Sequence, residues 1–122
     1  MTFSDIALSH RLERAEATAS AKFVEARARV APDGGAEWIE AGGAYAMFDG
    51  PASPITQTFG LGLFGPFTIQ GLEQLEAFFL HRGAPVCHEV SPLAGVEVAA
   101  ALAARGYRPI EFTSVMHRPV TA

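Results

Sequence analysis

The chain contains a single cysteine, Cys87, among its 122 residues, so no disulfide can form within it. A lone thiol is typical of proteins in a reducing compartment, and we expect a cytoplasmic location. Residues 1–9 lack a basic start and a continuous apolar stretch, so we expect no signal peptide. No segment contains the roughly 18 consecutive apolar residues that a membrane span needs. Disulfide-rich and membrane-spanning proteins are therefore not expected classes.

Positive charge is also scarce in this chain. Nine lysine and arginine residues stand against thirteen acidic residues, and the formal net charge at pH 7 is −4. Nucleic acids and anionic membranes attract clustered positive charge, so we expect neither as a partner. One cysteine and four dispersed histidines offer no spacing for a zinc site, and we expect no bound metal.

Apolar residues make up 49% of the sequence, enough to bury a core in one domain over residues 1–122. The first expected element is a long helix over residues 6–30, which ends before Pro32. Its N-cap is expected among three polar residues: Ser4, Asp5 and Ser9. Apolar residues recur at helical spacing and form a stripe, defined as Leu8, Leu12, Ala15, Ala19, Phe23, Ala26 and Val30. We expect the other face, with Glu13 and Arg14, to be solvated.

Two short strands are expected next, over residues 37–40 and 44–48. They flank Gly42 and Gly43, and paired glycines tolerate the positive φ that a tight hairpin turn needs. A third strand is expected over residues 55–64, because β-branched and aromatic residues are frequent there. Two glycines within it weaken that strand.

The second half of the chain alternates helices and strands. A helix capped by Thr68 and ended by Gly83 precedes a short strand over residues 85–90 and a helix over residues 95–105. The inward residues of the first of these helices are expected to be Leu72, Leu75 and Phe79. Alternation favours parallel pairing, whereas the hairpin needs antiparallel pairing. We therefore expect an α/β or α+β class, with a mixed, mostly antiparallel central sheet over residues 36–119 and about three flanking helices.

The chain ends on a helix, a glycine, an aromatic residue and an alternating strand. Gly106 supplies the left-handed conformation that a helix end needs, and Tyr107 follows it. In the strand, Ile110, Phe112 and Met116 fall on one face, with Glu111, Thr113 and His117 on the other. This ending, over residues 102–119, resembles the C-terminal end of the GNAT acetyltransferase superfamily. By the order of elements, the resemblance extends over roughly residues 37–119.

The resemblance implies a coenzyme A loop between the third strand and the following helix. The family pattern Q/R-x-x-G-x-G/A is present as Gln57, Gly60 and Gly62. Alternatively these residues belong to the strand, because Gly65-Pro66 disfavours a helix start directly after them. In that case the acetyl-CoA site would lie near the start of the helix, at four residues: Leu63, Phe64, Gly65 and Thr68.

The candidate catalytic residues are His88 and Glu89, on the strand over residues 85–90. Adjacent residues of a strand point to opposite faces, so each is a separate candidate base for an amine. Glu89 is the stronger candidate, because a carboxylate can also orient a cationic amine. The tyrosine that protonates the departing thiolate in the family has no counterpart, since Ala101 and Leu102 stand at its place.

These features lead to two hypotheses for function. The first is a GNAT-type N-acetyltransferase that moves an acetyl group from acetyl-CoA to a small-molecule amine. The second is a catalytically degenerate GNAT-like domain, which resembles the first half of a two-part GNAT protein. Such a domain would serve association with, or regulation of, a second acetyltransferase unit. It predicts a homodimer or packing against a second GNAT domain, for example through the apolar stripe of the first helix.

Overall fold

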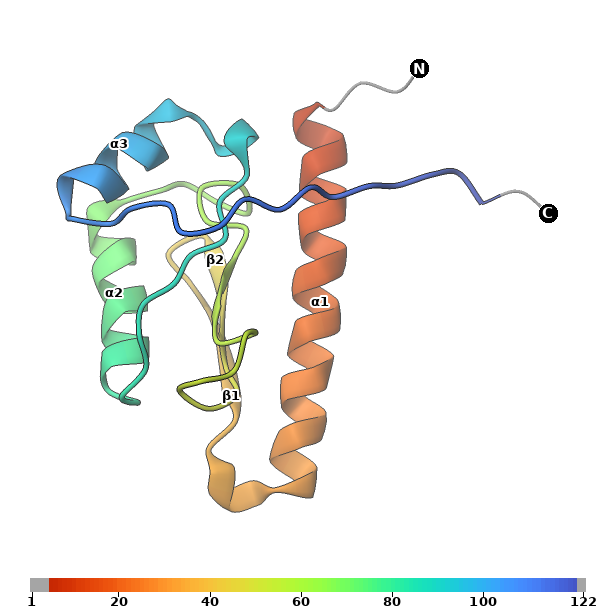
Figure 1. The fold of residues 1–122 in the computed structure, drawn as a ribbon, viewed down its shortest axis with the longest axis vertical. Coiled ribbons are helices and arrows are strands. Elements are labelled where there is room, and N and C mark those ends of the chain that lie inside the picture. The colour runs from red at the N-terminus through yellow and green to blue at the C-terminus, as the bar shows by residue number, and fades with distance from the viewer. Residues whose placement is uncertain (1–4, 121–122) are drawn as a thin grey trace.

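The computed structural model describes residues 5–120. Over these residues it contains three α-helices and a three-stranded antiparallel sheet, which confirms a mixed α and β fold class. The elements are α1 (Ile6–Val30), η1 (Pro32–Gly34), β1 (Glu37–Ala41), β2 (Ala44–Phe48), β3 (Gln57–Phe59), α2 (Ile69–Leu80), η2 (Pro92–Ala94) and α3 (Val96–Ala104). In Figure 1 the strands form a central layer, with α1 on one side and α2 and α3 on the other.

β1 and β2 form the predicted hairpin, in which Ala41 pairs with Ala44 at the turn. Gly42 and Gly43 occupy that turn with φ values of 57° and 73°, so both need the left-handed conformation. β3 pairs antiparallel with the other edge of β2, which gives the strand order β1-β2-β3.

The hairpin turn lies against the start of α2 at two close backbone contacts. A Cβ on Gly71 would lie 2.7 Å from the Cα of Gly42, and a Cβ on Gly43 would lie 2.9 Å from the carbonyl of Gly65. Real Cβ atoms do not tolerate such distances, so these backbones meet only because the glycines have no side chains. The contacts hold the β1–β2 turn over the loop that leads into α2.

Alternate residues of β2 contribute to the two halves of the core. Ala44, Ala46 and Phe48 pack with α2 and α3, whereas Met47 packs with α1. The α2–α3 half contains the larger set of buried apolar side chains: Leu61, Leu72, Leu75, Phe78, Phe79, Val98 and Leu102. The predicted inward face of α2 is therefore confirmed.

Helix α1 has the predicted bounds. Asp5 caps it, because its carboxylate accepts a hydrogen bond of 2.7 Å from the Leu8 amide. Ser4, another predicted cap, lies outside the described residues. Although α1 has 25 residues, neither it nor any other helix in residues 5–120 is apolar enough to cross a membrane.

The face that α1 buries is not the predicted apolar stripe. Ala17, Ala21 and Val24 pack against the sheet, and Val24 is only 1% exposed. Phe23, in the stripe, is 49% exposed. The expectation that the face with Glu13 and Arg14 is solvated is wrong, because both residues are partly buried on the side of α1 that meets the sheet. The apolar stripe lies on the opposite side of the helix.

The third strand is shorter than predicted. β3 covers Gln57–Phe59, whereas the composition predicts a strand over residues 55–64. Gly60 and Gly62 have φ values of 77° and 74°, and these left-handed residues turn the chain out of the sheet. The glycines therefore end the strand and do not lie within it.

The predicted strand over residues 85–90 contacts the sheet at one parallel bridge, between Thr58 of β3 and His88. The Thr58 amide donates to the Cys87 carbonyl at 3.0 Å, and the Glu89 amide donates to the Thr58 carbonyl at 3.2 Å. Because β3 ends one residue later, the two strands part beyond this bridge. In the described part of the chain the sheet is therefore antiparallel, and the predicted strand over residues 85–90 is wrong, because this segment meets β3 at that bridge alone.

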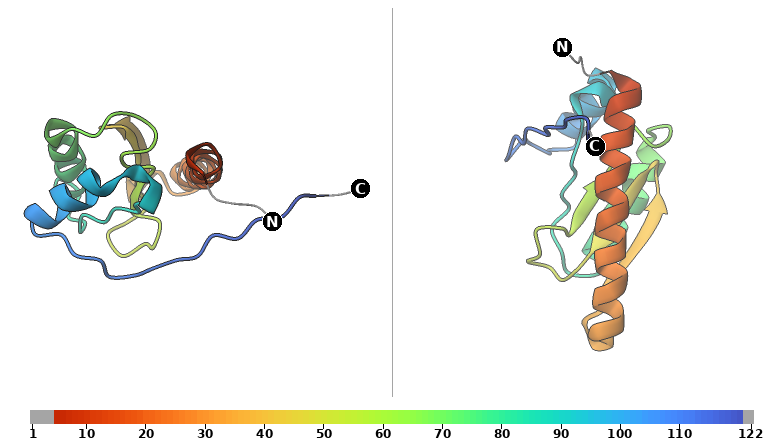
Figure 2. Two further views of the ribbon diagram at one scale, coloured as in Figure 1. Left: turned by 90° about the horizontal axis from the view of Figure 1, so that it is seen from above. Right: turned by 90° about the vertical axis from the view of Figure 1, so that its right-hand side faces the viewer.

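The predicted C-terminal strand is wrong for the chain as folded. Residues 108–120, here called the C-terminal arm, are exposed and belong to no sheet. Figure 2 shows the arm, in blue, crossing the molecule transverse to the strands and passing beyond α1. An alternating segment forms a strand only when it runs alongside a sheet edge, parallel or antiparallel, and the arm crosses the strands instead.

Candidate functional site

His88 and Glu89 lie at the bridge to β3 and point to opposite sides of the sheet. The imidazole of His88 is on the α2–α3 side, where its ring centre is 5.1 Å from that of Tyr107. The carboxylate of Glu89 is on the α1 side, beside Glu13 and Glu16. The two predicted catalytic residues therefore belong to two separate environments.

Three carboxylates from two distant parts of the sequence meet on the α1 side of the sheet. One oxygen from each of Glu13, Glu16 and Glu89 lies within 4.8 Å of the other two. Glu13 and Glu16 are three residues apart on α1 and so share one side of it. One oxygen of Glu13 and one of Glu89 are buried without a hydrogen-bond partner among the described residues. We call these three residues the carboxylate cluster.

The surroundings of Glu89 raise its pKa to about 7. Burial is the main cause, because it disfavours the charged form, and the charges of Glu16 and Glu13 add to it. Burial also raises the pKa of Glu13, with the charge of Glu16 as the second cause. A carboxyl group of this kind both holds and releases a proton near neutral pH. The cluster can therefore take up a proton, an ammonium group or a small hard cation.

On the α2–α3 side, His88 belongs to a hydrogen-bonded chain that runs to the end of α3. Its Nδ1 lies 2.8 Å from the Thr58 hydroxyl, and its Nε2 lies 3.2 Å from the Tyr107 hydroxyl. Tyr107 donates to Glu76 at 2.8 Å, and Arg105 forms an ion pair with the same carboxylate. The chain links β3, the strand segment over 85–90, α2 and the end of α3.

The donors in this hydrogen-bonded network determine which nitrogen of His88 carries the proton. Because Tyr107 donates to Glu76, Nε2 of His88 carries the proton shared with Tyr107, and Nδ1 accepts from Thr58. The imidazole is thus neutral, and burial lowers its pKa to about 4, although the charge of Glu76 opposes this. The hydrogen bond from Arg105 lowers the pKa of Glu76. Both nitrogens of His88 are occupied, so the geometry favours Glu89 as a base.

Two of the four residues predicted to bind acetyl-CoA have their amides occupied. The N–H groups of Leu63 and Phe64 both donate to the Gly60 carbonyl, at 2.8 and 3.0 Å. The Phe64 ring packs against Tyr45, and the Arg14 guanidinium lies 4.0 Å from its centre. A pyrophosphate needs several free amides that converge on it, and these two are not free in this conformation.

The other two predicted cofactor residues, Gly65 and Thr68, lie at the start of α2. The backbone of Gly65 packs against Gly43. The Thr68 hydroxyl accepts a hydrogen bond of 2.9 Å from the Gly71 amide and so caps the helix. The loop brings the four predicted residues together, but they do not fit the phosphates of acetyl-CoA, and we derive no step through that group.

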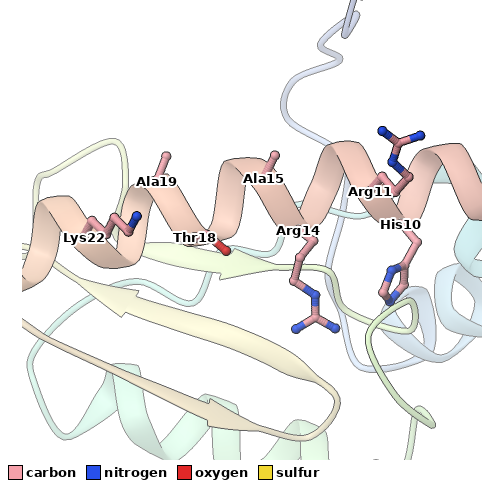
Figure 3. A pocket seen from close by; sticks show the side chains of 7 residues that line it. All are labelled: His10, Arg11, Arg14, Ala15, Thr18, Ala19 and Lys22. Atoms are coloured by element: carbon pink, nitrogen blue, oxygen red, sulfur yellow. The ribbon is translucent and has the colours of Figure 1, made fainter.

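An open hollow of about 610 Å³ lies along α1 (Figure 3). All its lining residues come from that helix: His10, Arg11, Arg14, Ala15, Thr18, Ala19 and Lys22. Arg14 is held in place, because its Nη1 donates to the Tyr45 hydroxyl at 2.8 Å. In Figure 3 Arg14 and His10 point toward the sheet. The hollow is basic, so α1 carries positive charge there and negative charge at the carboxylate cluster.

Sequence reasoning did not identify Glu13, Glu16 or Tyr107 as site residues. The charge pattern places the two glutamates on a solvated helix face, whereas the fold places both beside Glu89. Their one signal in the sequence is a spacing of three on a predicted helix. For Tyr107 the one signal is its place directly after the helix-ending Gly106. No protein-family model, curated protein or solved structure matches this chain.

Proposed function

We propose that this chain is a GNAT-like domain whose carboxylate cluster binds the amine acceptor of an N-acyl transfer reaction. The observation that carries this proposal is the meeting of three carboxylates, in which one oxygen from each of Glu13, Glu16 and Glu89 lies within 4.8 Å of the other two. Burial among them raises the pKa of Glu89 to about 7. A base is most effective when its pKa lies near the working pH. Ionised carboxylates also form charge-assisted hydrogen bonds with ammonium groups, so a small-molecule amine is the substrate class that suits this cluster.

The order of the elements supports the proposal. β3 is followed by α2 and then by the parallel strand segment over residues 85–90, which is the order expected for a GNAT-type core. The two strands share the bridge at Thr58 and part after it. An acceptor site of this class is expected in such a gap, and Glu89 directly follows the bridge.

The residues of the cluster divide the chemistry between them. Glu13 and Glu16 would hold the ammonium group, and Glu89 would take one proton from its nitrogen. The nitrogen then has a free electron pair, which is the form of an amine that reacts with an acyl group. The acyl donor has no part in these steps, because the loop before α2 does not fit its phosphates.

A second candidate function is a catalytically degenerate GNAT-like domain that associates with another acetyltransferase unit. Two observations favour it. The amides of Leu63 and Phe64 are occupied, so these two predicted residues offer no N–H groups to a phosphate in this conformation. The apolar stripe of α1 lies on the side away from the sheet, and Phe23 within it is 49% exposed.

Titration with butylamine tests the amine site directly. We expect binding at pH 8, where Glu89 is mostly ionised, and weaker binding at pH 5, where it is protonated. Glu89→Gln should weaken binding at pH 8 by about tenfold, because it removes a charge-assisted hydrogen bond. Glu97→Gln is the matched control, since Glu97 is an exposed carboxylate in the first turn of α3. Equal binding by the two variants would contradict the proposal.

Calorimetry with acetyl-CoA separates the two candidate functions. Measurable heat, together with a rise in melting temperature, would support an N-acetyltransferase and would require the loop before α2 to rearrange. No heat and no thermal shift at millimolar acetyl-CoA would leave the degenerate domain. The amine titration has its own outcome in either case.

A further inference from the structure

The C-terminal arm is the largest feature that the proposed function leaves unused. All of its residues are exposed, and within residues 5–120 none of them forms a hydrogen bond. It carries five large apolar side chains: Ile110, Phe112, Val115, Met116 and Val120. Phe112 and Met116 are 91% and 90% exposed. An isolated extended segment with this much exposed apolar surface is not stable in water and needs a partner surface.

The strand segment over residues 85–90 presents a free sheet edge. The backbone groups of Cys87 and Glu89 bond inward to Thr58, so those of Val86 and His88 turn outward. In the described part of the chain, the outward backbone groups of Val86 and His88 have no hydrogen-bond partner. A row of such groups is a template for an additional strand.

The side chains of the arm match the two faces of this edge. Val86 and Val90 pack against the apolar core on the α2–α3 side, and the carboxylate cluster lies on the α1 side. In the arm, Ile110, Phe112 and Met116 alternate with Glu111, Thr113, Val115 and His117. A strand added here would place the first set beside Val86 and Val90, and the second set, three of whose four residues are polar, beside the cluster.

The arm does not run along the edge of its own chain. The hydrogen bonds of Tyr107 to Glu76 and His88 hold the start of the arm level with the second half of the strand segment. Only Glu89, Val90 and Ser91 remain beyond that point before η2 begins. From there the arm crosses the strands and projects past α1, as Figures 1 and 2 show. A projecting arm next to a free edge is the geometry from which two molecules can exchange strands.

We propose that two copies of this chain associate by exchanging their C-terminal arms, each arm adding a strand to the Val86–Val90 edge of the other copy. Main-chain hydrogen bonds between the arm and the edge provide affinity. The apolar side chains on one face of the arm fix the register, because a shift by one residue would expose them. Reciprocal exchange uses the same two surfaces on both copies, so it closes with two-fold symmetry and occupies both free edges.

Sedimentation equilibrium of the full chain, from low to several hundred micromolar, tests this proposal. We expect a monomer of 12.9 kDa to convert to a dimer of twice that mass as concentration rises. Replacing Ile110 and Phe112 by serine should weaken the dimer at least about tenfold, since it removes the apolar contacts. The matched double variant Glu111→Ser/Thr113→Ser changes two side chains on the opposite face of the arm and should weaken the dimer far less. Phe23→Ser, in the apolar stripe of α1, should leave it unchanged.

Cys87 provides a test of where the arm binds. Because side chains alternate along a strand, Cys87 lies on the α1 side of the edge. In the exchanged strand the side chains of Glu111, Thr113 and Val115 would lie on that same side. Cysteine placed in turn at Glu111, Thr113 and Val115 should, at one of these positions, form a disulfide with Cys87 of the other copy under mild oxidation. Phe112→Cys has the opposite parity and should not form it. Mass spectrometry of the non-reduced peptides identifies the pair.

Three outcomes would overturn the proposal. The first is a monomer over the whole concentration range. The second is a dimer that the Ile110→Ser/Phe112→Ser variant leaves intact. If Phe23→Ser disrupts that dimer instead, the interface lies at the apolar stripe of α1. The third is a disulfide to Cys87 within one chain, or slow amide exchange of the arm in the monomer, since either result means that the arm pairs with its own edge. Circular dichroism of each variant checks that it is folded.

Discussion

At the scale of single residues, two neighbours in the sequence depart from their ordinary pKa values in opposite directions. Burial raises the pKa of Glu89 to about 7 and lowers that of His88 to about 4, because in each case it disfavours the charged form. The neighbouring charges differ: Glu89 meets two further carboxylates, whereas His88 lies near the single carboxylate of Glu76. The alternation of a strand is enough to separate these environments.

Replacing Glu89 with glutamine should stabilise the protein at alkaline pH. Between pH 4.5 and about 7 the folded protein binds more protons at this site than the unfolded chain, so the wild type loses stability as pH rises through that window. We expect Glu89→Gln to melt about 3 °C above the wild type at pH 8 and at the same temperature at pH 4. Thermal melts at both pH values measure this. An equal difference at both would contradict a raised pKa.

His88 should make the protein sensitive to acid. Between pH 6.5 and about 4 the folded protein binds fewer protons at this site than the unfolded chain, so stability is lost as pH falls through that window. The full effect is roughly 3 kcal/mol. His88→Gln should remove this loss, at a cost of about 1–3 kcal/mol at pH 7 from its unsatisfied partners. Urea unfolding at pH 7 and pH 4.5 measures both terms, and His81→Gln, at an exposed histidine, should change neither.

At the scale of elements, local signals placed the helices and the hairpin correctly. They failed at residues 55–64, where glycine had two possible roles, and at the C-terminal arm, where a strand needs an edge to pair with. The Thr68 cap and the Gly42-Gly43 turn were recognised because each acts within a few residues of itself. Gly60 and Gly62 fit either a strand with close neighbours or a turn, and the composition alone favours the strand. Their positive φ values end β3, and each glycine lies where a side chain would not fit: a Cβ on Gly60 would overlap the Phe64 ring, and one on Gly62 would lie 2.6 Å from Val98 of α3.

The contact between the hairpin turn and α2 predicts a strong effect of one methyl group. Gly71→Ala would place a Cβ 2.7 Å from the Cα of Gly42, so the turn or the helix must shift. We expect a cost of about 1–3 kcal/mol, although alanine is the better helix former. Gly34→Ala is the matched control, because its Cβ would meet nothing within 4 Å. Chemical denaturation of both variants measures the difference, and equal stabilities would show that the two backbones are not in contact.

The orientation of α1 can be tested by a pair of adjacent residues. Val24 is 1% exposed and faces the sheet, so Val24→Asp should cost more than about 3 kcal/mol, because it buries an unpaired charge. Phe23→Asp, on the outward stripe, should change the stability of the monomer by about 1 kcal/mol or less. Circular dichroism melts at low protein concentration report both. The reverse order of effects would mean that the predicted stripe is the buried face.

At the scale of the whole molecule, α1 divides two surfaces of opposite charge. The carboxylate cluster lies where it meets the strand segment over 85–90, and the basic hollow with Arg11, Arg14 and Lys22 lies along its other side. The C-terminal arm passes near the acidic side, since Glu111 contributes to the raised pKa of Glu89. The proposed amine site and the proposed exchange of arms therefore adjoin each other.

Removing the arm should affect stability only through association. Its residues are exposed and make no hydrogen bonds within the described part of the chain, so a chain that ends at Arg108 should melt as the wild type does at low concentration. At high concentration the wild type should melt at a higher temperature, because association stabilises the folded state, and the truncated chain should not. Melts over a hundredfold range of concentration measure this. A concentration dependence in both chains would place the association elsewhere.

The three helices, the hairpin turn, the caps and the opposite directions of His88 and Glu89 follow from the sequence by itself. They depend on interactions between residues near each other in the chain, which patterns of apolar residues and glycines reveal. The buried face of α1 was decided by the tertiary structure, because two faces of that helix are apolar enough and only contact with Met47 selects one. The meeting of Glu13 and Glu16 with Glu89 was also decided there, since it joins segments more than seventy residues apart.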